Sequence, residues 1–199
     1  MAAITLKIYL TDIEPKITRT VTVSSDSSMY LLHHIIQEAM GWKNYHLYHF
    51  KIKNLNIGDL RLLLMDGYDE MEMNPVDGKE IMVGEIFTAV AQTIDYVYDY
   101  GDYWKHKIEL VEINHKPQQL VLPVLVSGTN ACPPEDCGGS HGYEELKKVL
   151  KNVHHADYIQ MLTWVGADFN PEKFNKKTVV KNLAKLNDLI TNYEKGFLK

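Results

Sequence analysis

Reactive side chains are concentrated in one part of this chain, residues 98–143. That part begins with the motif YDYGDYWKH at residues 98–106 and ends with CPPEDCGGSHGY at residues 132–143. The apolar segments between the motifs can fold as a strand pair that brings them together. Carboxylates and an imidazole that meet in this way can shift one another's pKa values and hold a hydrated Mg²⁺ or Mn²⁺ ion for hydrolysis. The candidates for this chemistry are Asp99, Asp102, His106, Glu135 and Asp136.

The second motif also offers ligands of the kind that zinc prefers. Cys132, Cys137 and His141 stand at spacings that thiolate and imidazole ligands use, and His106 or an acid can be the fourth ligand. A closed structural zinc site usually has two complete ligand pairs, however, and two successive prolines stiffen this loop. Two free thiols are therefore the expectation, with a zinc site and a Cys132–Cys137 disulfide as open alternatives.

The same motifs also suit a purely structural role. Residues 99–102 read Asp-Tyr-Gly-Asp, which can form a turn whose carboxylates accept hydrogen bonds from backbone amides. Glu135 or Asp136 can cap the following helix or accept a hydrogen bond from Trp104 or a tyrosine. Two glycines, Gly138-Gly139, can supply the positive φ that the entry into this helix requires.

Two structural criteria separate these roles. A reaction centre requires at least three of the five candidate side chains within ~5 Å of a common point that is open to solvent. A structural role requires the carboxylates to be buried and bonded to backbone amides or to Trp and Tyr donors. Strand alternation gives Asp102 and His106 one face and Asp99 the other, unless Gly101 resets the register. This parity slightly favours the structural role.

Hydrophobic periodicity indicates the secondary structure that carries the motifs. Three segments alternate between apolar and polar side chains, as half-buried strands do: residues 4–10, 17–23 and 45–53. Between the second and the third lies a helical stripe that ends at Gly41, where a left-handed residue is needed. This strand-strand-helix-strand order is typical of the start of a β-grasp roll. His33 and His34 fall off the helical stripe, so we expect them to face the solvent.

Together with the rest of the chain, these patterns predict an α+β fold of about seven strands in a single domain, residues 1–199. Residues 1–142 are expected to be mostly β with one main helix, and their later strands to be mixed or antiparallel. The helical C-terminal third, residues 143–199, is expected to be an extension packed on that part. The segments that complete the prediction are strands at 60–65, 94–100, 104–113 and 120–126, a short helix at 83–92 and a long final helix through 179–190.

The composition is that of an ordinary folded protein. The chain has 199 residues, of which 45% are hydrophobic and 24% charged, and its formal net charge is −5. Nucleic-acid binding relies on cationic side chains that neutralise phosphates, and the only arginines are Arg19 and Arg61. No apolar run reaches the ~20 residues of a membrane span, and the N-terminus lacks a signal-peptide pattern. We expect a soluble cytoplasmic protein with no membrane segment, whose partner is a protein or a small molecule rather than nucleic acid.

The two motifs, taken at full length, resemble a known family. YDYGDYWKHKIELVE followed by GTNACPPEDCGGSHGY is similar to the signature of the Ri-plasmid ORF-three-like family, also described as transposon-passenger TnpR-type proteins. LLHHIIQEAMGWKNYHLYHF and WVGADFNPEKF extend the resemblance over nearly the whole chain; Tyr100, where Phe is more usual, is a small departure. The resemblance implies an α+β fold and a mobile-element association, without an established activity. The TnpR label suggests a resolvase, but a serine recombinase needs more arginines and a basic helix-turn-helix.

Two hypotheses for the function follow. The first is a non-enzymatic binding or interaction module that holds a protein or a small ligand at residues 98–143. The second is a metal-assisted hydrolase that uses the Asp/Glu/His cluster of that stretch. The sequence requires no cofactor; zinc at Cys132, Cys137 and His141, or Mg²⁺ at the carboxylates, is compatible with it.

Overall fold

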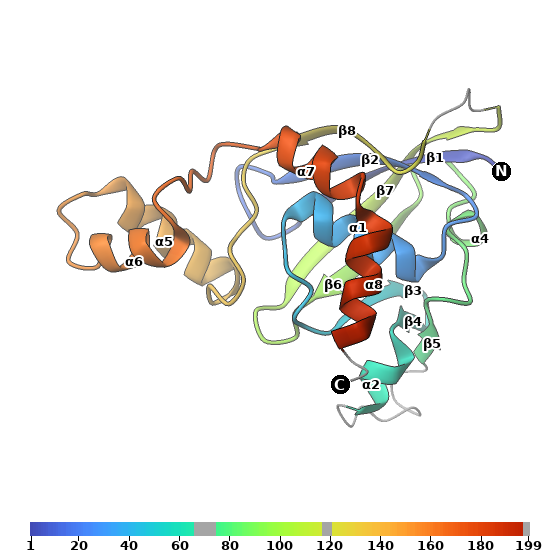
Figure 1. Cartoon of the computed structure of the whole chain (residues 1–199), viewed down its shortest axis with the longest axis horizontal. Helices are drawn as coiled ribbons and strands as arrows, with labels where there is room; N and C mark the ends of the chain where they lie inside the picture. The colour runs from blue at the N-terminus through green and yellow to red at the C-terminus, as the bar shows by residue number, and fades with distance from the viewer. Residues whose placement is uncertain (66–74, 117–120, 197–199) are drawn as a thin grey trace.

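A single mixed sheet of eight strands organises the described part of the chain, in the order β5-β4-β3-β6-β7-β1-β2-β8. The computed structural model describes residues 1–65, 75–116 and 121–196, and Figure 1 shows their arrangement. Within these residues β4 and β5 pair in parallel and the other neighbours pair antiparallel. The strands are β1 (Ala3–Leu10), β2 (Thr18–Ser24), β3 (Tyr48–Ile52), β4 (Leu55–Gly58), β5 (Pro75–Asp77), β6 (Thr93–Tyr98), β7 (Trp104–Asn114) and β8 (Val124–Thr129).

Helices cover one face of this sheet and also form a projecting lobe. The α+β class and the strand-strand-helix-strand start are as predicted. In Figure 1, α1 lies on the sheet, α7 and α8 lie over α1, and the pair α5 and α6 projects to one side. The division into a β part and a packed helical extension within one domain stays a prediction. The helices are α1 (Met29–Met40), α2 (Leu60–Met65), α4 (Val83–Ile86), α5 (Gly139–Lys151), α6 (Tyr158–Val165), α7 (Lys176–Leu183) and α8 (Leu186–Gly196).

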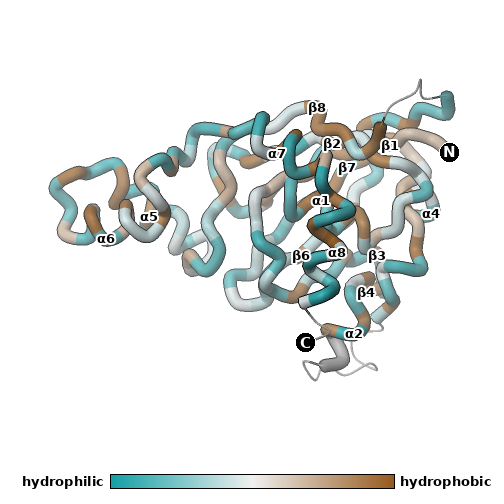
Figure 2. Tube along the Cα trace, viewed as in Figure 1, coloured by the Kyte–Doolittle hydropathy of each residue, from teal (hydrophilic) through white to brown (hydrophobic). Residues whose placement is uncertain are grey.

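The core forms where α1 meets the concave face of the sheet. Ser28 caps α1 by accepting a hydrogen bond from the Leu31 amide, and Gly41 ends it at φ 96°. The apolar stripe of α1 packs against the inward residues of β1, β2, β6 and β7, and Figure 2 shows apolar segments gathered in this layer. The fully buried side chains at this interface include Leu6, Ile8, Val21, Leu32, Ile35, Ile36, Tyr96 and Ile108.

Several predicted elements differ from the observed ones. Residues 60–65, predicted as a strand, form helix α2, because the Asp59 carboxylate accepts a hydrogen bond from the Arg61 amide at its start and leucines favour a helix. The short helix predicted at 83–92 stops at Ile86, and Val90 is exposed. The predicted long final helix is two helices, α7 and α8, which are separated by Ala184 and Lys185. The sheet also gains β4 and β5, so it has eight strands instead of seven.

The prediction that His33 and His34 face the solvent is wrong. Both side chains are buried: His33 packs against β3 and β6, and His34 lies under α8. His33 stacks on Tyr48 with ring centroids 3.4 Å apart, and its ring nitrogens lie 2.9 Å from the Tyr96 hydroxyl and 2.7 Å from Asn44 Oδ1. The His34 ring contacts Tyr193 of α8 edge-to-face. Burial lowers the pKa of His34 to about 4, so this ring is neutral at pH 7.

Stability should therefore fall as the solution becomes acidic. The pKa of His34 is 6.5 in the absence of burial and about 4 in the folded protein, so the unfolded chain takes up the proton first. Above pH 6.5 the ring is neutral in both states and His34 costs the fold nothing. As the pH falls from 6.5 to 4, the free energy of unfolding decreases by on the order of 3 kcal/mol because of this residue. We expect His34→Gln to reduce the slope of this part of the curve in urea denaturation at pH 4.5–7.5, since the lowered pKa values of His33, His49 and His106 supply the rest. The exposed variant His115→Gln should keep the wild-type slope; a parallel curve for His34→Gln would contradict the buried neutral ring.

Candidate metal centre

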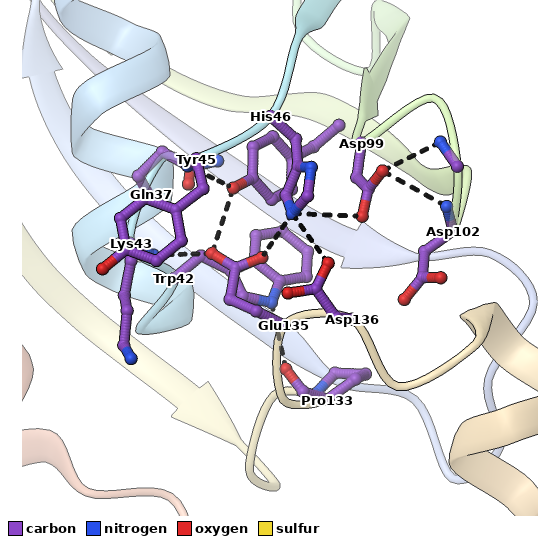
Figure 3. Close-up of polar contacts among 12 residues, drawn as sticks. Gln37, Trp42, Lys43, Tyr45, His46, Asp99, Asp102, Pro133, Glu135 and Asp136 are labelled. Carbon is purple, nitrogen blue, oxygen red and sulfur yellow. Dashed lines mark hydrogen bonds and ion pairs between the residues drawn. The ribbon is translucent and has the colours of Figure 1, made fainter.

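Three loops meet at the end of the sheet where β3 and β6 lie side by side (Figure 3). Tyr48 of β3 pairs with Tyr98 of β6, and the Asp99 amide donates to the Leu47 carbonyl at 2.9 Å. This antiparallel pairing sets His46, just before β3, beside Asp99, just after β6. The loop before α5 crosses the same end of the sheet and adds Glu135 and Asp136. The site is therefore assembled from parts of the chain that are far apart in sequence.

The His46 ring is the centre of the cluster. Its Nε2 atom lies 3.6 Å from Asp99 Oδ2, 3.9 Å from Glu135 Oε2 and 3.1 Å from Asp136 Oδ1. Ligand atoms of His46, Asp99 and Asp136 all lie within 4.8 Å of one another, a spacing at which they can share one ion. Asp99 is 5% exposed, Glu135 11% and Asp136 69%, so the cluster is buried on one side and open on the other.

Each of the two buried carboxylates uses one oxygen for structure and directs the other at His46. Asp99 Oδ1 accepts from the Gly101 and Asp102 amides at 2.8 and 3.2 Å. Glu135 Oε1 accepts from the Lys43 amide at 2.7 Å and from the Tyr98 hydroxyl at 3.0 Å. The buried atoms His46 Nε2 and Glu135 Oε2 have no hydrogen-bond partner among the described residues. The bonded oxygens fix the orientation of both carboxylates, as outer hydrogen bonds do around metal ligands.

The electrostatics of Glu135 suit a cation. Burial raises the pKa of Glu135, and the bonds from the Lys43 amide and the Tyr98 hydroxyl offset part of that effect. A buried carboxylate with a raised pKa is costly to keep ionised, and a nearby positive charge reverses that cost. A divalent ion beside Oε2 would therefore stabilise the ionised form of Glu135.

The predicted acids divide between the cluster and its support. Asp99, Glu135 and Asp136 come together, whereas Asp102 Oδ2 accepts from the Gly138 amide at 3.1 Å and ties the turn to the loop. His106 lies in the core, where its Nδ1 atom is 3.0 Å from the Trp104 carbonyl oxygen, and burial lowers its pKa to about 4. Asp99 and Glu135 therefore have both predicted roles: one oxygen of each carboxylate accepts hydrogen bonds from backbone amides, and the other faces His46.

Sequence reasoning missed His46. Nothing in the spacing of KNYHLYHF distinguishes it from the other histidines, because its neighbours in the cluster lie more than fifty positions away. Only the pairing of β3 with β6 makes it a neighbour of Asp99. A correct prediction that β3 pairs with β6 would have placed His46 next to Asp99.

The zinc ligands proposed from sequence are not brought together in the described residues. In that part of the chain, one group of three His, Cys, Asp or Glu side chains lies close enough to share an ion. It consists of His46, Asp99 and Asp136, and it includes none of Cys132, Cys137 and His141. Cys132 and Cys137 are free thiols and His141 is exposed. Burial raises the pKa of Cys132, and raises that of Cys137 to about 12, which disfavours the thiolate form that zinc binds.

The fold and this cluster define a mixed α+β protein with a carboxylate–histidine centre at one end of its sheet. Over residues 2–178 the sequence matches the plasmid pRiA4b ORF-3-like protein family, and the chain belongs to that family. The uncharacterized protein y4hQ of Sinorhizobium fredii (strain NBRC 101917 / NGR234) is 32% identical over 167 residues, which are 83% of this chain and 82% of that protein.

A solved structure has the same fold. The crystal structure of the protein of unknown function MM3350 from Methanosarcina mazei Go1 superimposes with a TM-score of 0.78 at 32% sequence identity. The match covers 88% of this chain and 96% of that chain. The names of these relatives state no activity.

Proposed function

We propose that the protein is a binding module that holds one divalent metal ion at His46, Asp99, Glu135 and Asp136. The observation that carries this proposal is the convergence of three carboxylate oxygens on His46 Nε2. The mixed nitrogen and oxygen donors favour Mn²⁺ or Zn²⁺ over Ca²⁺ and Mg²⁺, which prefer oxygen alone. Three carboxylates and a neutral imidazole leave a charge of about −1 once a divalent ion is bound, which is a modest imbalance.

A hollow of about 410 Å³ adjoins the cluster and offers room for the ligand of the module. Glu135 and Asp136 form part of its wall, together with Lys43 and Tyr45. Four protein donors leave coordination positions free on an ion that takes six ligands, and these positions bind water or an anionic group of the ligand. The ammonium of Lys43 would favour an anionic group on the same side.

Two further aspects of the proposal concern partners and location. We propose a protein or small-molecule ligand rather than nucleic acid, because Arg19, one of only two arginines, is buried and bonded to backbone carbonyls. In the part of the chain that the structure describes, no helix has the length and apolar character needed to cross a bilayer. A cytoplasmic location remains part of the proposal; a reducing compartment would keep the two cysteines as the free thiols observed.

Metal titration of chelator-treated protein tests the proposal. We expect saturable binding of one Mn²⁺ or Zn²⁺ ion by isothermal titration calorimetry. A hundredfold excess over Kd should add about 2.7 kcal/mol of stability, which raises Tm by about 5–10 °C for a chain of this size. His46→Gln and Asp136→Asn should each weaken binding at least ~10-fold, by loss of a ligand. The control Glu112→Gln, an exposed acid of β7, should bind like wild type. No saturable binding of either ion, or unchanged binding by His46→Gln, would refute the proposal.

A metal-assisted hydrolase is the second candidate, and the exposure of Asp136 favours it. Asp136 lies where the cluster opens into the hollow, so a metal-bound water there would meet an incoming substrate. The metal-loaded protein can be assayed with p-nitrophenyl phosphate and p-nitrophenyl acetate. Turnover that requires the metal and falls at least ~100-fold in Asp136→Asn would establish hydrolysis; metal binding without turnover would leave the binding module alone.

A further inference from the structure

The projecting lobe formed by α5 and α6 exposes apolar side chains that nothing in the described chain covers. Helix α6 reads YIQMLTWV, yet none of its residues is buried. Trp164 is 49% exposed, and Figure 2 shows hydrophobic segments in this lobe, away from the main core. A large aromatic side chain held half exposed over a hollow is a feature of binding surfaces.

The hollow lies between α5 and α6 and has a volume of about 510 Å³, within the range of pockets that bind small groups. Its lining combines apolar side chains, among them Leu146, Val149, Met161 and Trp164, with the three acids Asp136, Glu145 and Asp157. Arginine, lysine and histidine are absent from this lining. The chemistry of the hollow therefore matches a group that has an apolar stem and a positive end.

Two acids of the hollow, Glu145 and Asp157, can exchange their present partners for a ligand. Glu145 pairs with Lys148 at 3.2 Å and Asp157 with His155 at 3.8 Å, and all four side chains are substantially exposed. Such surface pairs contribute about 0–1 kcal/mol and exchange readily with solvent or a competing cation. A cation over the Trp164 face would gain a cation–π interaction in addition to these carboxylates.

Two adjoining hollows indicate a polypeptide rather than a small amine. The 510 Å³ hollow and the 410 Å³ hollow beside the metal cluster share two lining residues, Asp136 and Trp164. A ligand that occupies both hollows would reach from the α5–α6 lobe to Lys43 and Tyr45. An extended peptide can place one side chain in each hollow.

We propose that the hollow between α5 and α6 binds a lysine side chain of a partner polypeptide. The four methylenes of lysine pack on Met161, and the ammonium lies at Trp164 and the acidic rim. The hollow shares Asp136 with the proposed metal site, but its other lining residues are not metal ligands, and the inference does not require the ion.

Titration of ¹⁵N-labelled protein by NMR tests this inference. The probe is the peptide acetyl-Ala-Leu-Lys-Leu-Ala-amide, compared with the peptide in which norleucine replaces lysine and with n-butylamine. We expect the lysine peptide to shift the amides of Leu146, Met161 and Trp164, to bind at least ~5-fold more tightly than the norleucine peptide and to weaken as salt is added. Trp164→Ala should weaken binding at least ~10-fold, and Glu145→Gln with Asp157→Asn, which preserves packing, at least ~3-fold.

The controls separate this site from the metal centre and from self-association. Ile159→Ala, at another exposed apolar residue of α6, should bind the lysine peptide like wild type. Equal binding of the lysine and norleucine peptides would overturn the inference, as would n-butylamine binding as tightly as the peptide. A dimer by light scattering that Trp164→Ala dissociates would assign the surface to a second copy and would also overturn it. All of these titrations use chelator-treated protein, so failure of the metal proposal leaves this result unaffected.

Discussion

Arg19→Met should be strongly destabilising, with a loss of about 4 kcal/mol or more. Arg19 is 1% exposed, and its guanidinium donates to four backbone carbonyls, which carry no formal charge. The acceptors are Ala39, Thr18 and Thr129, each at 2.7 Å, and Asn130 at 3.0 Å. These carbonyls belong to the last turn of α1, to β2, and to the end of β8 with the residue after it.

The cause of the expected loss is the set of acceptors left behind. Methionine fills part of the space but cannot donate, and each buried carbonyl without a donor costs about 1–3 kcal/mol. The ring of Phe174, whose centroid lies 4.1 Å from the Arg19 guanidinium carbon, also loses a cation–π contact. Ala39 stands at the C-terminal end of α1, where the helix dipole favours a positive charge.

The second arginine supplies the matched control. Arg61 is half exposed and pairs at 2.9 Å with Asp59, which is 3% exposed, so Arg61→Met breaks a single ion pair and should cost less than Arg19→Met. Urea denaturation at pH 7 measures both variants, with unchanged m values as the condition for comparing them. Arg19→Lys should recover part of the loss, because one ammonium can reach some of the carbonyls. If Arg19→Met lay within ~1 kcal/mol of wild type, the carbonyl network would not be a major stabilising feature.

Gly142→Ala should also be strongly destabilising and should disrupt the metal centre. A Cβ at residue 142 would overlap the carbonyl oxygen of Cys137, a backbone atom that cannot move without displacing the loop. The Gly142 amide donates to the Gly138 carbonyl at 3.0 Å, so α5 starts directly against that loop. We expect a loss of about 3 kcal/mol and weaker metal binding, because Glu135 and Asp136 lie in the displaced segment.

Gly196→Ala is the control for this substitution. Gly196 is the last residue of α8, and a methyl group added there would have no described heavy atom within 4 Å. The variant should therefore gain up to ~1 kcal/mol from the better helix former. Thermal unfolding and Mn²⁺ titration of both variants give the comparison. Gly142→Ala with wild-type stability and wild-type metal affinity would show that the loop before α5 does not position the cluster.

Periodicity predicted much of the fold because it is a local property. The alternation in residues 4–10 and 17–23 corresponds to β1 and β2, and the helix that ends at Gly41 is α1. The prediction failed where local patterns are ambiguous: the apolar run at 60–65 has the length of a buried strand, but its leucines and the cap at Asp59 make it a helix. The final helix was predicted as one because a two-residue interruption leaves the apolar period almost unchanged.

The sequence predicted the carboxylates of the candidate site but not the histidine that they face. The motifs identified Asp99, Glu135 and Asp136, since dense polar groups beside glycines and prolines mark a constrained loop. They also predicted that these carboxylates bond backbone amides, and Asp99 Oδ1 and Glu135 Oε1 do so. Whether the second oxygen of each was free depended on which side chain lay opposite, and that side chain is His46.

By itself the sequence determined the α+β class, the order of most elements, the family and the stretch that holds the acids of the cluster. These depend on residue type and short-range spacing, which any chain displays before it folds. Only the tertiary structure decided that His46 completes the cluster, that His106 lies in the core and that Arg19, His33 and His34 are buried. Those facts depend on strand register and on helices packed from distant parts of the chain, because burial and proximity belong to the assembled fold and not to any one segment.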